Sequence, residues 1–203
     1  MTEPQTEARV RDAVRRATGR ETDAGPVTRL AGHASMRSYW RVGAPPDALV
    51  VMVLPPDARP EEVTKGGPAA VNPFVDVQRY LAGLGVRVPA IHAFYEAEGL
   101  MVLEDLGDEM LETRLLAGAP RAPLYEAAID QLARLRARAE ARPGGCVAYG
   151  RSFDFDLYRW ELVHFLEWGL EAWKGATLGP AEKEVVDRHF DRIARALEAE
   201  PKG

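Results

Sequence analysis

The sequence predicts an α+β protein with a five-stranded antiparallel sheet and one inserted helix, followed by an all-helical region. Two observations support this fold class. In the first half of the chain, short apolar runs are bounded by glycine, proline or asparagine, which is typical of strands. After Asp108, apolar residues recur mainly three or four positions apart, which is typical of helices. We therefore expect two lobes, at 1–107 and 108–203, joined by a hinge at 103–107.

The change of pattern falls in the segment 100–108, which reads Leu-Met-Val-Leu-Glu-Asp-Leu-Gly-Asp. Its apolar start predicts a buried strand, which the acidic residues after Leu103 cannot continue. Gly107 frees the backbone to turn, and Asp108 can cap a following helix. A core strand followed by a capped helix is the ordinary alternative for this segment taken alone.

The expected strands lie at residues 27–30, 36–42, 49–54, 91–95 and 100–103. In the second strand, alternation places Trp40 and Val42 on one face of the sheet. Arg37, Tyr39 and Arg41 then share the other face. The third strand is a continuous apolar run. The last two strands are joined by a short glycine-containing turn, which predicts an antiparallel hairpin.

The expected helices lie at residues 7–18, 73–84, 123–139, 153–173 and from 180 onward. Asn72 suits the N-cap of the second helix, with proline at the first helical position. Gly85 suits the left-handed conformation that commonly follows a last helical turn. The helix at 153–173 is apolar around most of its circumference, so it belongs in a larger core than the chain obviously provides. Uncovered apolar side chains there favour self-association.

Composition excludes several classes of partner. Of 203 residues, 46% are hydrophobic and 28% charged, which is ordinary for a soluble globular protein. The net charge of −5 gives no electrostatic footprint for nucleic acid or an anionic membrane. No apolar run approaches the roughly 20 residues of a membrane span. The acidic N-terminus is unlike a secretory signal, and one cysteine allows no internal disulfide, so a cytoplasmic setting is expected.

Metal and thiol chemistry are weakly indicated. Glu161, His164 and Glu167 share a helical face, but three ligands without a distant fourth are weak evidence, and packing or surface placement is favoured. Cys146 has neither a histidine partner nor a C-x-x-C context, so a catalytic thiol is not expected. We assign no metal ligand and no catalytic residue from the sequence.

Three stretches carry a resemblance to a known family: Gly32–Val42 (GHASMRSYWRV), Asn72–Pro89 (NPFVDVQRYLAGLGVRVP) and Leu100–Asp108 (LMVLEDLGD). Together they resemble the aminoglycoside phosphotransferase and choline kinase-like superfamily, small-molecule kinases with a protein-kinase-like fold. Within it, the chain is most similar to bacterial kinases that phosphorylate N-acetylmuramate and N-acetylglucosamine at the anomeric hydroxyl, which implies a role in cell-wall recycling. The segment 153–168 resembles the first large helix of their C-terminal lobe, so the resemblance covers most of the chain from about residue 28.

The resemblance implies a site for ATP, with Mg²⁺ in the intact parent protein. The turn from Gly32 to Ser35 would lie over the phosphates, where small residues let backbone N–H groups approach the oxygens; an ordinary hairpin turn is the alternative. Tyr39 would form the roof of the adenine pocket, and simple sheet packing is the alternative. The backbone of Glu104 and Leu106 would bond to the adenine edge, because a hinge strand has free N–H and C=O groups there.

One departure from the family concerns the phosphates. The third strand of this fold normally carries a lysine that pairs with them, and Met52 stands in its place. The sugar kinases that the chain resembles share this replacement, so it need not mean inactivity. Arg37 or Arg41, both on the Tyr39 face, could supply the missing charge.

The sugar is expected near the helix at 153–173. By resemblance, Asp156, Arg159 and Glu161 would lie in or beside the sugar cleft. Surface salt bridges on a helix are at least as good an interpretation of these charges.

A second departure concerns catalysis. Phosphoryl transfer needs a carboxylate for the acceptor hydroxyl and Mg²⁺ ligands, which the family supplies from an H-R-D-x-x-x-x-N loop and a later aspartate. No such motif is present in the sequence. We therefore expect the front portion of a truncated ATP-dependent amino-sugar kinase, inactive alone. A non-catalytic module that binds a nucleotide or a protein is the alternative.

Overall fold

The computed structural model describes residues 2–19, 25–31, 37–54 and 72–201. The chain forms two compact units, residues 1–146 and 147–203. The predicted phosphate turn, Gly32 to Ser35, lies outside the described residues. Among the described helices, none is long and apolar enough to cross a membrane.

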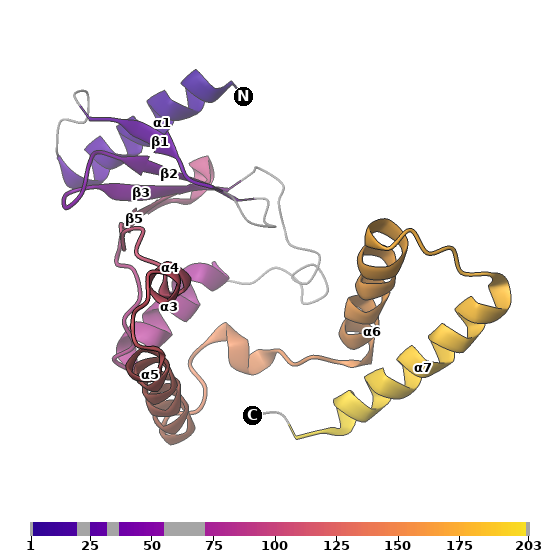
Figure 1. Cartoon of the computed structure of the whole chain (residues 1–203). Coiled ribbons are helices and arrows are strands. Elements are labelled where there is room, and N and C mark those ends of the chain that lie inside the picture. The colour runs from indigo at the N-terminus through magenta and orange to yellow at the C-terminus, as the bar shows by residue number, and fades with distance from the viewer. Residues whose placement is uncertain (1, 20–24, 32–36, 55–71, 202–203) are drawn as a thin grey trace. The chain divides into compact units, whose positions relative to one another are not determined.

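The first unit is built on one antiparallel sheet (Figure 1). Its strands are β1 (Val27–Arg29), β2 (Ser38–Val42), β3 (Leu49–Val53), β4 (Ile91–Tyr95) and β5 (Leu100–Glu104). The order across the sheet is β1-β2-β3-β5-β4, with every neighbouring pair antiparallel. This confirms the predicted fold class. The hairpin between β4 and β5 is also confirmed, with a short 3₁₀ turn, η1 (Glu96–Glu98), at its tip.

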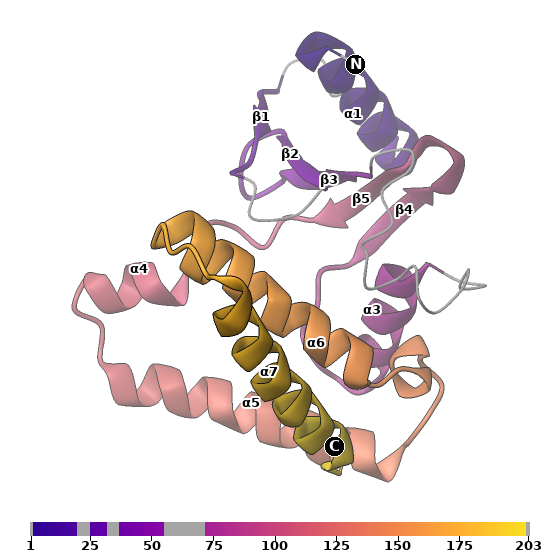
Figure 2. The ribbon, with the colours of Figure 1, turned by 90° about the vertical axis from the view of Figure 1, so that its right-hand side faces the viewer.

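Helix α1 (Glu3–Thr18) covers one face of this sheet (Figure 2). Val10, Ala13 and Val14 are buried against it. The strands contribute a continuous apolar layer to the same cluster: Trp40, Val42, Leu49, Val51, Val53, Leu100 and Val102. Alternation along β2 therefore places Trp40 and Val42 on one face, as predicted, and the structure shows that α1 covers this face.

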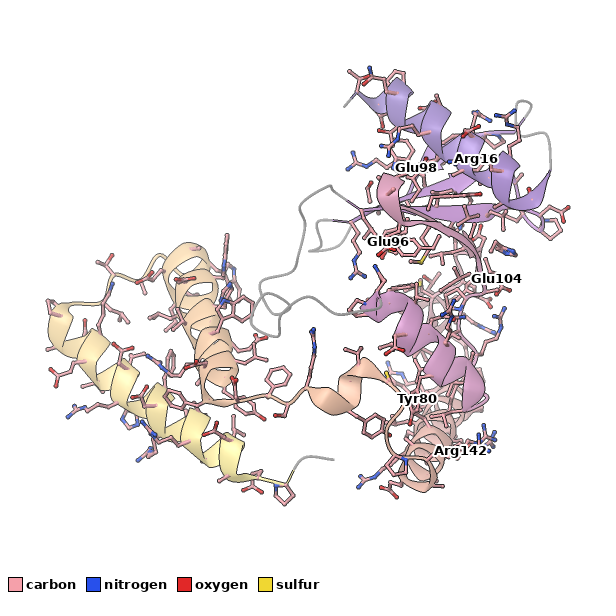
Figure 3. All side chains as sticks on the ribbon, turned by 180° about the vertical axis from the view of Figure 1, so that it is seen from behind. Arg16, Tyr80, Glu96, Glu98, Glu104 and Arg142 are labelled. Atoms are coloured by element: carbon pink, nitrogen blue, oxygen red, sulfur yellow. The ribbon has the colours of Figure 1, made fainter. Side chains whose placement is uncertain are left out.

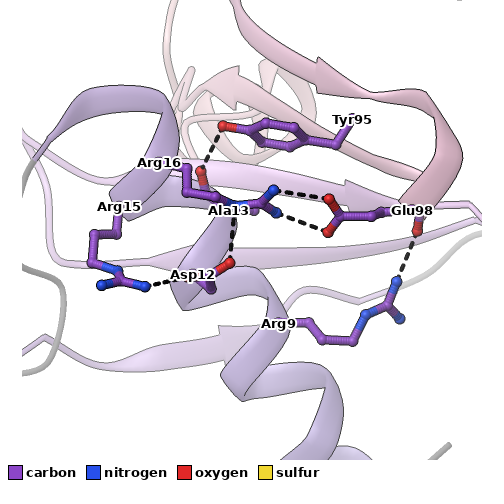
Figure 4. Close-up of polar contacts among 7 residues, drawn as sticks. All are labelled: Arg9, Asp12, Ala13, Arg15, Arg16, Tyr95 and Glu98. Carbon is purple, nitrogen blue, oxygen red and sulfur yellow. Dashed lines mark hydrogen bonds and ion pairs between the residues drawn. The ribbon is translucent and has the colours of Figure 1, made fainter.

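A polar network fastens α1 to the tip of the β4–β5 hairpin (Figures 3 and 4). Arg16 donates two hydrogen bonds of 2.8 Å to the carboxylate of Glu98, and its guanidinium lies 4.0 Å from the centre of the Tyr95 ring. Arg9 donates to the Glu98 carbonyl oxygen at 2.7 Å. The bond from Arg16 lowers the pKa of Glu98. These contacts fix the helix over the apolar layer.

Helix α3 (Pro73–Gly83) packs on the opposite face. Its N-cap is confirmed, since the Asn72 side chain accepts the Phe74 N–H at 3.0 Å. Gly85 adopts a φ of +72°, as predicted for the residue after the last turn. Val75 is buried in a second cluster that is separate from the α1 layer. Its other buried members are Val50, Met52, Met101 and Leu103.

The described part of the first unit also contains α4 (Leu111–Leu116) and α5 (Arg121–Ala141). The prediction that Asp108 caps the next helix is wrong, because α4 begins at Leu111 with Met110 as its N-cap. Helix α5 is joined to the end of α3 by a hydrogen bond of 2.6 Å from Arg138 to the Leu84 carbonyl oxygen.

The second unit contains η2 (Val147–Gly150), α6 (Phe155–His164), η3 (Phe165–Trp173) and α7 (Pro180–Ala199). The helix predicted at 153–173 is thus continuous, but its second half, η3, is a π-helix. Its aromatic side chains are exposed, as expected: Trp168 is 67% exposed and Trp173 is 76% exposed.

Candidate functional site

The residues predicted to contact the nucleotide lie in the first unit, on the α3 face of the sheet and in the segment that leaves β5. Tyr39 pairs with Met52 across β2 and β3, and Met52 pairs with Met101 across β3 and β5. Tyr39 is half-buried against the cluster under α3. It therefore has some surface left for a ligand.

Met52 is a core residue. Its side chain is fully buried in the α3-face cluster, among Val50, Val75, Met101 and Leu103. It therefore offers a nucleotide neither a charge nor accessible surface. The position that carries a phosphate-binding lysine elsewhere in this fold serves packing here.

Arg41 lies on the same face as Tyr39 and is held by two carboxylates at the end of β5. Its Nε donates to Asp105 Oδ2 at 2.5 Å and its Nη2 to Asp105 Oδ1 at 3.1 Å. Its Nη1 and Nη2 donate to the two oxygens of Asp108, at 2.7 and 2.8 Å. Asp108 and then Asp105, as hydrogen-bond acceptors, raise the pKa of Arg41, and Arg41 lowers the pKa of Asp108.

This pairing argues against the hypothesis that Arg41 replaces the missing lysine. A guanidinium has five N–H donors, and the hinge uses one on Nε, one on Nη1 and two on Nη2. With two carboxylates around one cation, the cluster carries a formal charge of about −1, which repels phosphate. Arg37 remains the candidate for phosphate charge; its guanidinium lies 5.9 Å from the centre of the Phe74 ring at the start of α3.

The hinge turn between the two carboxylates exposes Leu106 and Gly107. The Asp105 side chain accepts the Gly107 N–H at 2.9 Å, and Gly107 has a φ of +80° that glycine adopts without strain. Leu106 is 58% exposed. Within the described part of the chain, no hydrogen bond occupies its backbone N–H or C=O. Among the described residues, the backbone groups of Leu106 are therefore open, and their contact with an adenine edge remains a prediction.

Glu104 differs from the prediction. It is the last residue of β5, and its N–H donates to the Ala90 carbonyl oxygen at 2.9 Å. The expectation of a free N–H at this position is therefore wrong. The side chain bonds to Arg87, at 2.8 and 2.5 Å, and accepts the Ala90 N–H at 3.1 Å. Glu104, labelled in Figure 3, thus holds the segment that precedes β4 through its bonds to Arg87 and Ala90.

Acidification is expected to weaken this anchor. Bonds from Arg87 and from the Ala90 N–H lower the pKa of Glu104 from 4.5 to about 2. A carboxylate with a depressed pKa contributes stability above its unfolded pKa, and that contribution is lost as the pH falls from 4.5 to about 2. Melting temperatures of the wild type and Glu104→Gln should converge across this window. A difference that stays constant with pH would contradict the assignment.

The residues predicted for the sugar lie on α6 in the second unit. Arg159 bonds to Asp187 at 3.0 Å and to Asp191 at 2.9 Å, both on α7, so it braces the two helices. Its Nη1 is buried and has no partner among the described residues. Asp156 and Glu161 are exposed on the helix. The salt-bridge interpretation therefore describes Arg159, and a sugar contact remains a prediction for all three.

Sequence reasoning missed Asp105 and Asp108 as partners of Arg41. No local sequence signal pairs them. The strand order, in which β3 lies between β2 and β5, brings the end of β5 close to an arginine on β2. Within the described residues, no group of three or more His, Cys, Asp or Glu side chains could hold a metal ion.

Comparison with known proteins identifies the class. Residues 26–203 match the model of the phosphotransferase enzyme family, and the chain belongs to that family. The resemblance seen in the sequence is thereby confirmed. Helix α1 precedes the matched region.

Three relatives carry the name N-acetylmuramate/N-acetylglucosamine kinase. The protein from Caulobacter vibrioides is 37% identical over 125 residues, which are 53% of this chain and 34% of the relative. The protein from Pseudomonas putida is 30% identical over 182 residues, 90% of this chain and 49% of the relative. The protein from Pseudomonas aeruginosa is 32% identical over 169 residues, which are 83% of this chain and 45% of the relative. The chain thus spans between a third and a half of the length of these relatives.

Proposed function

We propose that this chain carries the nucleotide-binding part of an ATP-dependent phosphotransferase. The observation that carries the proposal is the hinge: among the described residues, no hydrogen bond occupies the backbone groups of Leu106. The residue before it, Asp105, is bonded to Arg41, which shares a sheet face with the half-buried Tyr39. A purine has a donor and an acceptor along one edge and an apolar ring face, so these residues suit it. Arg37 would supply charge near the phosphates. ATP, when bound, supplies the phosphoryl group, and Mg²⁺ neutralises the charge that develops during transfer.

An N-acetylated amino sugar is the proposed acceptor. The names of the three relatives support N-acetylmuramate or N-acetylglucosamine. The anomeric hydroxyl would receive the phosphoryl group, and Asp156, Arg159 and Glu161 would lie near the sugar. A cytoplasmic setting, with access to ATP, and a role in cell-wall recycling follow from this proposal. The proposal also includes the division into an ATP-binding lobe, residues 1–107, and a helical lobe, residues 108–203.

The 203-residue chain is proposed to bind ATP without turning it over. Phosphoryl transfer needs a carboxylate to accept the hydroxyl proton and oxygen ligands for Mg²⁺. The sequence holds no H-R-D-x-x-x-x-N motif to supply them. The aromatic side chains of η3 are exposed to solvent. We therefore also propose that the chain associates with itself at high concentration, because association would cover them.

Leu106→Pro is expected to weaken Mg-ATP binding at least tenfold, because proline has no N–H to offer the adenine edge. Leu106→Ala is the matched control: it keeps the N–H and should bind within about threefold of the wild type. Calorimetry gives the affinities, circular dichroism checks folding, and N-acetyl sugars test for phosphorylation. Absence of ATP binding by the wild type, or equal affinity in both variants, would refute the site. Turnover would refute the proposed inactivity.

A further inference from the structure

Arg41 connects two parts of the first unit that are far apart in the sequence. It lies in β2, on the face of the sheet that Tyr39 also faces, and its partners Asp105 and Asp108 follow the end of β5. The side chain of Arg41 is largely buried, and Asp105 is only 7% exposed. Asp108 is 74% exposed. The inner half of this cluster is therefore shielded from solvent, and its outer half is open.

The geometry of the cluster requires arginine. Each carboxylate receives two N–H groups from the guanidinium plane, on two of its sides. Such forked pairs fix orientation as well as distance, and a lysine ammonium cannot reproduce them. The guanidinium thus determines where Asp105 and Asp108 lie relative to β2.

Those two carboxylates bracket the proposed adenine contact. Asp105 and Asp108 flank Leu106 and Gly107, and Asp105 also accepts the Gly107 N–H. Leu106 itself has no hydrogen bond within the described residues that would hold its backbone. The backbone orientation of Leu106 therefore depends on its neighbours, and through them on Arg41.

We propose that Arg41 is a positioning residue for nucleotide binding. It acts through Asp105 and Asp108, which hold the Leu106 backbone in the orientation that receives the purine edge. This inference rests on the proposed function. In this proposal, Arg41 supports recognition of the base and does not itself bind the phosphates. Ordering the hinge before the ligand arrives removes an entropic cost of binding.

Affinities for adenosine, ADP and Mg-ATP distinguish the two roles. With Arg41→Ala, we expect adenosine to bind about tenfold more weakly, because the base contact is disturbed. ADP and Mg-ATP should lose at least as much, since the substitution also leaves Asp105 and Asp108 without their cation. Arg41→Lys should not restore binding, and Asp108→Ala should give a smaller loss of about threefold. Arg136→Ala is the control: it removes an arginine from an exposed ion pair with Glu140 on α5 and should change nothing. A loss that grows with the number of phosphates, with adenosine unaffected, would overturn the proposal.

A second measurement needs no ligand. In ¹⁵N relaxation experiments on the nucleotide-free chain, Arg41→Ala and Asp108→Ala should make the amides of Leu106 and Gly107 more mobile than in the wild type. Unchanged hinge amides in both variants would overturn the positioning role. Because Asp108 is exposed, its variant keeps the test available if Arg41→Ala fails to fold. If the wild type binds no adenosine compound, the proposed function fails, and the relaxation data alone decide whether Arg41 orders the hinge.

Discussion

Ala13→Asp is expected to unfold the first unit or bring it close to unfolding. Ala13 has no exposed surface and lies on the face of α1 that packs against the sheet, between Val10 and Val14. An aspartate there must either bury an uncompensated charge or lift the helix from the apolar layer. Substitutions of this kind cost roughly 3–5 kcal/mol, which is a large share of the ~5–15 kcal/mol that stabilises a typical domain.

The matched control is Ala8→Asp, the same substitution on the exposed side of the same helix. It should change the free energy of unfolding by no more than about 0.5 kcal/mol. Urea denaturation followed by circular dichroism compares the two variants. If both lose the same stability, helix propensity would explain the effect and the packing of α1 on the sheet would not.

Met52→Lys is expected to destabilise the first unit without creating an ATP-binding charge. Met52 is fully buried, and the residues of its cluster are all apolar. A lysine there loses hydration among the apolar side chains of this cluster, so burial would lower its pKa and favour the neutral amine. We expect a loss of about 3 kcal/mol or more. The affinity for ATP should not rise, although the substitution introduces the residue that this fold usually carries.

Met52→Leu is the control for this substitution, because it nearly conserves volume and should cost less than about 1.5 kcal/mol. Thermal unfolding and ATP calorimetry on the two variants give the comparison. A lysine variant that stays stable and binds ATP more tightly would show that position 52 faces the phosphates. That result would also remove the need for Arg37 as a source of charge.

Helix α1 belongs to the same folded unit as the sheet, although it lies before the region that matches the family. The family match begins at residue 26, yet α1 at 3–18 supplies buried residues to one face of the sheet. Without α1, the apolar layer that includes Trp40, Val51 and Val102 would be open to solvent on that face. A version of the chain cut to the matched region would therefore lack part of its core.

The sequence by itself determined the five strands, most of the helices and the family, whereas α4 was not among the expected helices. The strands and helices were predictable because alternation, helical periodicity, the Asn72 N-cap and the left-handed Gly85 are local signals. Local patterns also misled at Asp108, whose carboxylate is a good N-cap by type but is bound to Arg41. At Glu104, the nearby Ala90 carbonyl takes the N–H that was expected to be free.

Only the tertiary structure decided what the polar residues of the candidate site do. Arg41 and Asp105 are 64 positions apart and meet because β2, β3 and β5 are neighbours in the sheet. Met52 is a packing residue because α3 covers its face of β3. In each case the role depends on which distant segment lies opposite. Backbone periodicity fixes the face of a strand on which a side chain lies, whereas its partner is fixed by strand order and helix packing.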